Sequence, residues 1–154
     1  MPVFLASQKL LPGSKQILQR YDILISMNHS FPHNPPPQLP SVILKAKAAY
    51  QFWFVIFNDF PKSYRYSLGA KIDGYFLELL EFIFVSLYLP PEQKIVKLNY
   101  AISKLDGIKF FLQIAWENKC VPNEKYAGLS EKLNEVGRII GGWKKGLQTK
   151  TPPR

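Results

Sequence analysis

The positions of proline constrain this chain more than any other feature. Five of its 13 prolines lie within residues 28–40, a stretch that cannot continue a helix and is expected to be extended. Downstream, prolines at position 61, at the pair 90–91 and at position 122 separate four proline-poor segments in which apolar residues recur at helical spacing. This spacing predicts four α-helices, over residues 41–60, 67–89, 91–119 and 123–146, the second with Ser67 as its N-cap.

The chain has 154 residues, which suits one compact domain better than two. Short connections force successive helices to run antiparallel, so residues 41–147 are predicted to form an all-α, up-down-up-down four-helix bundle. Residues 1–40 are expected to be a mobile N-terminal extension with a proline-rich linker, and residues 148–154 a basic tail. Met27 directly precedes the proline-rich stretch, which leaves open an alternative in which translation begins there and residues 1–26 have no role.

The second and third predicted helices carry more apolar surface than one bundle can bury. Between residues 75 and 89, 12 of 15 positions are apolar, which exceeds the single stripe of a helix with one solvated face. The third helix has a heptad-spaced seam from Leu98 to Ala115 and a second apolar strip about half a turn away. Because monomers rarely expose large apolar patches, we predict a subunit interface in a homo-oligomer. Its candidate residues are Tyr100, Phe110, Phe111, Ile114, Phe76, Phe82, Phe84 and Tyr88.

Other coverings of this apolar surface can be compared with self-association. In one alternative the chain is a monomer, and the apolar segment 16–26 covers the strip. A membrane is not expected to cover it, because the stretch 75–89 contains two glutamates and is shorter than the roughly 20 apolar residues that a membrane-spanning helix needs. Among oligomers, a ring and a closed dimer would both satisfy the pattern.

The charge of the chain predicts an anionic partner. Lys and Arg number 20 against 11 Asp and Glu, a formal net charge of +9. In an antiparallel bundle one end would gather seven lysines (45, 47, 94, 97, 144, 145 and 150) against Glu92 alone, whereas the other end is nearly balanced. This asymmetry predicts binding of RNA or DNA through the phosphate backbone, and the 16 lysines against 4 arginines favour point-charge contacts over base reading. The candidate nucleic-acid-binding residues are Lys45, Lys47, Lys94, Lys97, Lys144 and Lys145, with Lys62 and Arg65 as a second group. The alternative is a solvated rim that serves solubility or an acidic protein partner.

Catalytic and metal-binding patterns are missing from the sequence. Glu78 and Glu81 are not followed by the histidines of a di-metal carboxylate bundle, so a salt-bridging or polar-edge role is expected for them. His29 and His33 fall in the proline-rich stretch, where no helix would bring them together. The single Cys120 cannot form an internal disulfide, which suits a reducing, cytoplasmic location. We therefore expect no enzyme, no cofactor and no metal site.

Two motifs point to a known family. The first is Phe60-Pro61-Lys62 followed by Arg65, Ser67-Leu68-Gly69 and Ile72, and the second is Gly137-Arg138 followed by Ile140 and Gly141-Gly142-Trp143. Over residues 41–146 the chain resembles a family of four-helix-bundle proteins. The family includes the accessory variability determinant (Avd) of diversity-generating retroelements and the proteins encoded in intervening sequences of bacterial large-subunit ribosomal RNA.

The resemblance implies a small basic bundle that assembles as a homopentameric barrel and binds nucleic acid without catalysis. In the Avd branch it implies a partnership with the reverse transcriptase of the element during template RNA-dependent, mutagenic cDNA synthesis. The leading hypothesis is therefore a retroelement accessory protein. A ribosomal-RNA intervening-sequence-type protein and a purely structural protein-interaction bundle are the alternatives.

Overall fold

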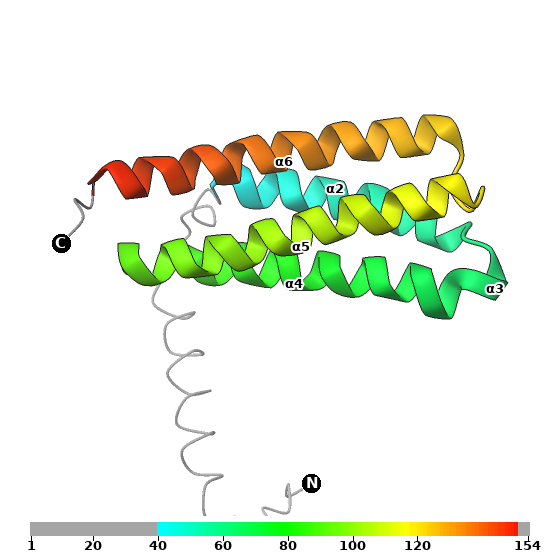
Figure 1. Ribbon diagram of the computed structural model, residues 1–154, viewed down its shortest axis with the longest axis horizontal. Helices are drawn as coiled ribbons and strands as arrows, with labels where there is room; N and C mark the ends of the chain where they lie inside the picture. Colours follow the sequence, from blue (N-terminus) through cyan, green and yellow to red (C-terminus); the bar gives the residue numbers. More distant parts are fainter. Residues whose placement is uncertain (1–39, 151–154) are drawn as a thin grey trace, which may run out of the picture. The chain divides into compact units, whose positions relative to one another are not determined.

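The computed structural model describes residues 40–150, and residues 1–39 and 151–154 lie outside this part of the chain. The predictions for the N-terminal extension, its proline-rich linker and the end of the basic tail therefore concern residues outside the described structure. The described residues form four long helices and two short helical segments (Figure 1). In chain order these are α2 (Ser41–Asn58), α3 (Lys62–Tyr64), the π-helix η1 (Arg65–Gly69), α4 (Ala70–Ser86), α5 (Pro91–Glu117) and α6 (Asn123–Lys150).

The long helices pack side by side, and each runs antiparallel to the long helix before it (Figure 1). α5 packs against α4 and α6, and α2 packs against the same two helices, so that the four form a closed square. The predicted all-α four-helix bundle is thus confirmed. α6 continues to Lys150, four residues beyond the predicted end of the last helix, because no proline follows Pro122 until Pro152.

The core lies between the four long helices. Trp53 of α2 has no exposed surface. The centre of its ring lies 5.7 Å from the ring centre of Phe57, 5.8 Å from that of Phe60 and 6.1 Å from that of Phe76. Every residue of the predicted α5 seam is buried, and four residues of α6 at helical spacing face it across the core. These core residues are Leu98, Ala101, Leu105, Ile108, Leu112 and Ala115 of α5, and Leu129, Leu133, Val136 and Ile140 of α6.

One polar group joins α2 to α4 at the edge of this core. The indole Nε1 of Trp53 donates a hydrogen bond of 3.2 Å to Oδ1 of Asp73. Burial raises the pKa of the nearby Tyr50 hydroxyl, and the charge of Asp73 and a hydrogen bond to it raise that pKa further. Because a buried indole N–H without a partner is costly, Asp73 fixes the register of α4 against α2.

The connection between α2 and α4 differs from the sequence prediction. The prediction that Ser67 caps the second helix is wrong, because helical structure restarts directly after Pro61 and runs through α3 and η1 into α4. Ser67 lies inside η1, where its hydroxyl donates to the carbonyl oxygen of Tyr64 at 3.3 Å. The π-helix is a wide turn of a kind often found at functional sites. No periodicity of apolar residues separates such a turn from an ordinary helix.

Arg65 closes the end of α2. Its Nη2 donates two hydrogen bonds of 2.9 Å, one to the carbonyl oxygen of Asn58 and one to that of Phe60. Asn58 is the last residue of α2 and Phe60 lies two residues beyond it, so neither carbonyl has a partner within that helix. The guanidinium therefore caps α2 and fixes η1 against it.

Replacing Arg65 by alanine is expected to lower the free energy of unfolding by about 2 kcal/mol, because two charge-assisted hydrogen bonds to main-chain carbonyls are lost. Urea denaturation followed by circular dichroism measures the change. Lys47→Ala removes an exposed cation of α2 without touching a cap, and it serves as the control. Equal stability of the two variants would show that the Arg65 bonds contribute nothing.

Gly107 permits the close packing of α5 on α4. A Cβ atom at this position would lie 2.5 Å from Cε2 of Tyr75, closer than side chains tolerate, whereas a Cβ at Gly74 would meet nothing within 4 Å. Both glycines lie inside helices, where alanine is favoured by about 1 kcal/mol. We expect Gly74→Ala to be stabilising and Gly107→Ala to be about 1–3 kcal/mol less stable than it, as thermal or urea unfolding would measure. Equal effects at the two positions would contradict the close contact.

Candidate nucleic-acid interface

Three helix ends meet at the end of the bundle where the lysines were predicted to gather. Trp143, near the end of α6, lines a cavity of about 310 Å³ together with Pro40, Ser41 and Val42 at the start of α2. The ammonium group of Lys94, in the first turn of α5, lies 5.3 Å from the centre of the Trp143 ring. Helix ends that are far apart in the sequence thus lie side by side (Figure 1). We call this the basic end of the bundle.

The basic end carries six lysines that the structure leaves accessible to solvent. Lys97 lies 5.6 Å from the centre of the Phe82 ring and 5.8 Å from that of Tyr100. A cation–π contact orients an ammonium group but leaves its positive charge in place. The six are Lys47, Lys145 and Lys150, which are exposed, and Lys94, Lys97 and Lys144, which are half-buried.

Lys45 differs from these six. Its ammonium Nζ lies 2.9 Å from Oε1 of Glu135, a residue in the middle of α6. The hydrogen bond from Lys45 lowers the pKa of the Glu135 carboxyl and so favours the charged form of that carboxyl. The sequence prediction counted Glu92 as the only acidic residue beside the lysines of this end. That count was wrong, because Glu135 pairs with one of these lysines. Glu135 was missed because its partner lies on another helix.

The second predicted group lies at the other end of the bundle. Arg65 is held by the two carbonyls at the end of α2, whereas Lys62 is exposed and has no ion pair within residues 40–150. A neighbouring lysine at this end, Lys125, pairs with Asp59 at 3.0 Å. The two ends therefore differ: Arg65 and Lys125 at this end are bonded to protein groups, whereas six lysines at the basic end are accessible to solvent.

The structure separates the eight candidate interface residues into three groups. Phe76 has no exposed surface and packs in the core against Tyr50 and Trp53, so its prediction as a surface residue is wrong. Its position at helical spacing with Ile72 and Leu79 turns it inward. The half-buried residues are Phe82, Phe111 and Ile114, and those with about half or more of their surface exposed are Phe84, Tyr88, Tyr100 and Phe110.

Further exposed apolar side chains were missed by the sequence analysis. Tyr66 of η1 is 87% exposed, more than any other large apolar side chain among the described residues. Helical periodicity identifies the apolar residues that face the core. It does not identify apolar residues that lie on the other faces of a helix. The others are Leu44, Phe54, Val55, Tyr64, Leu77 and Trp116.

The structure shows the surroundings of the acidic residues and the cysteine that were candidates for metal binding and reactivity in the sequence. Residues 40–150 contain no cluster of three or more His, Cys, Asp or Glu side chains that could hold a metal ion. The expected salt-bridging role is confirmed for Glu78, which pairs with Lys104 of α5. Burial raises the pKa of the Cys120 thiol, which disfavours a reactive thiolate. His29 and His33 lie outside the described residues.

None of the described helices combines the length and hydropathy that crossing a membrane requires.

The fold and the basic end define a class of small, basic four-helix bundles. Residues 42–147 match the model of the bAvd-like family. Because the match covers more than half of the chain, the protein belongs to this family, that of bacterial Avd, the accessory protein of diversity-generating retroelements. No curated protein matches the chain. Family membership implies a role beside the reverse transcriptase of such an element.

Proposed function

We propose that this protein is a non-enzymatic accessory protein of a diversity-generating retroelement that binds RNA or cDNA at the basic end and docks the reverse transcriptase of the element. The observation that carries nucleic-acid binding is the meeting of three helix ends, which places lysines of α2, α5 and α6 on one end of the bundle. Phosphates are held by such groups mainly through charge. The family match is to the Avd model, which favours the retroelement branch over the ribosomal-RNA branch.

The protein is proposed to act as a homo-oligomer, with a pentameric barrel as the expected form. Support comes from the large apolar side chains that a single bundle leaves exposed, since monomers rarely expose so many. The interface would use the exposed residues Phe84, Tyr88, Tyr100 and Phe110 together with the half-buried Phe82, Phe111 and Ile114. In a closed ring, the basic ends of all copies would lie on one rim, and their fields would add.

Gel-shift titration of the full chain tests nucleic-acid binding. Single-stranded RNA and duplex DNA are titrated at two salt concentrations, and light scattering records the oligomeric state of the same sample. We expect binding to both at low salt and a steep loss of affinity as salt rises. An assembled protein that binds neither at low salt would favour a structural protein-interaction bundle.

Co-expression with the reverse transcriptase of the same element tests the partnership. We expect the two proteins to copurify, and we expect the complex to survive nuclease treatment if the contact is between proteins. Separation of the two under all conditions would remove the polymerase from the proposed function and would leave nucleic-acid binding untouched.

A further inference from the structure

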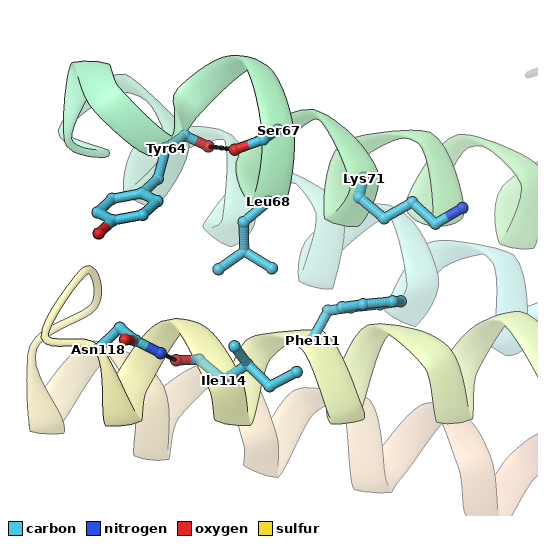
Figure 2. A pocket seen from close by; sticks show the side chains of 7 residues that line it. All are labelled: Tyr64, Ser67, Leu68, Lys71, Phe111, Ile114 and Asn118. Carbon is cyan, nitrogen blue, oxygen red and sulfur yellow. Dashed lines mark hydrogen bonds between the residues drawn. The ribbon is translucent and has the colours of Figure 1, made fainter.

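An apolar notch lies at the end of the bundle opposite the basic end. It measures about 460 Å³ and lies between the segment Tyr64–Lys71 and the last turns of α5. Figure 2 shows Tyr64 and Leu68 reaching toward α5 from one wall, with Phe111 and Ile114 facing them from the other. The complete lining is Tyr64, Ser67, Leu68, Lys71, Phe111, Ile114 and Asn118.

A projecting side chain lies on the same turn of the chain. Tyr66 is 87% exposed and is not part of the notch lining, although its neighbours at positions 64, 67 and 68 are. It belongs to η1, which Arg65 fixes through two hydrogen bonds to the end of α2. The wide π-turn thus directs Tyr66 outward while its neighbours line the notch.

The positions of Tyr66 and of the notch along the bundle axis decide whether their contact can form a closed ring or an open chain. Copies related by rotation about an axis parallel to the bundle contact each other at equal heights, so a projection and a notch at one height can close into a ring. Tyr66 and the notch share one helical turn and satisfy this condition. Tyr88 lies at the other end of the molecule, and its insertion into the notch would produce an open, head-to-tail chain.

We propose that Tyr66 of one copy of this chain inserts into the notch of the next copy, forming the heterologous contact that closes the ring. The inference rests on the self-association proposed above and names the two surfaces that make it. Tyrosine suits this role because its ring supplies a large apolar contact while its hydroxyl can remain at the wet edge of the interface.

Charge complementarity supports a second copy as the occupant of the notch. Lys62 lies one turn before Tyr66 and is exposed, so a cation accompanies the projecting ring. Glu117 lies one turn after Ile114 on the lip of α5, where it accepts a hydrogen bond of 2.8 Å from Nε2 of Gln113. Within residues 40–150 neither Lys62 nor Glu117 has an ion-pair partner. When Tyr66 enters the notch, Lys62 of one copy approaches Glu117 of the next.

Mixing two variants provides the sharpest test. Tyr66→Ser removes the projection and leaves the notch open, whereas Ser67→Trp fills the notch and leaves Tyr66 in place. Ser67 is exposed, so the added indole occupies the notch without entering the core. Each variant alone is expected to be monomeric in native mass spectrometry and light scattering. Their mixture is expected to form 1:1 dimers through the one intact contact, a result that an interface not joining position 66 to the notch cannot give.

Charge reversal tests the orientation of the contact independently. Lys62→Glu and Glu117→Lys are each expected to raise the protein concentration needed for assembly by about tenfold or more, and the double variant is expected to restore assembly. Leu44→Ser is the matched control, since Leu44 is exposed near the basic end and takes no part in the contact. Circular dichroism confirms that each variant is folded.

The outcomes separate this inference from the proposed function. If the natural sequence assembles and the variants at positions 62, 66, 67 and 117 assemble equally well, the contact described here is wrong while self-association stands. If the natural sequence is monomeric at every concentration, self-association fails and the contact fails with it. Nucleic-acid binding by the basic end is measured separately in either case.

Discussion

Replacement of four lysines at the basic end by glutamine is expected to abolish most of the salt dependence of RNA binding. The four are Lys94, Lys97, Lys144 and Lys145, which the meeting of α5 and α6 brings together. Each lost phosphate contact makes the plot of log affinity against log salt shallower by about 0.7 for single strands and about 0.9 for duplex DNA. The full variant should therefore lose about 3 from the slope, together with most of its affinity at low salt.

A control variant must remove the same charge from another part of the molecule. Glutamine at Lys109, Lys119, Lys125 and Lys132 removes four positive charges away from the basic end, and it should change the slope much less. Light scattering on both variants shows whether assembly is retained, because a ring multiplies the number of contacts. Equal losses in the two variants would mean that net charge, and not the basic end, governs binding.

Trp53→Ala is expected to lower the free energy of unfolding by about 3–5 kcal/mol. The indole is fully buried, it contacts the rings of Phe57, Phe60 and Phe76, and its Nε1 donates to Asp73. Alanine would leave a cavity among these three aromatic rings and would remove one hydrogen-bond partner of Asp73. A loss of this size is a large fraction of the total stability of a domain, about 5–15 kcal/mol.

Urea denaturation followed by circular dichroism measures this loss. All samples are compared at one protein concentration, because assembly couples to folding stability. Leu44→Ala, at a half-exposed position of the same helix, is the control and is expected to change stability by no more than about 0.5 kcal/mol. A Trp53→Ala variant as stable as this control would contradict the packing described for α2 and α4.

The periodicity of apolar residues predicted the core of the bundle well wherever a helix has one apolar face that packs on its neighbours. The seam of α5 is buried at every predicted position, since a heptad repeat has only one way to face its neighbours. Helix ends were predicted less well. The π-turn at Arg65–Gly69 depends on hydrogen bonds from Arg65 to a different helix, and no local pattern contains that information.

The candidate site shows the same division between local and non-local information. That the start of α5 lies beside the end of α6, where Lys94 contacts Trp143, was predicted from antiparallel order alone, because that order fixes which helix ends are neighbours. The pairing of Lys45 with Glu135 and the burial of Phe76 depend on helix rotation and on side chains from other helices. Tyr66 was not predicted as a contact residue, because a single aromatic residue in a turn produces no periodic pattern in the sequence.

The contact between Lys94 and Trp143 has a practical consequence for spectroscopy. Trp143 is one of three tryptophans, and an ammonium group above an indole alters the electrostatic field that sets its emission wavelength. A phosphate that draws Lys94 away would shift the emission of this residue, while Trp53 inside the protein would keep its own. The shift in emission of Trp143 would therefore report occupancy by intrinsic fluorescence, without a dye or a label.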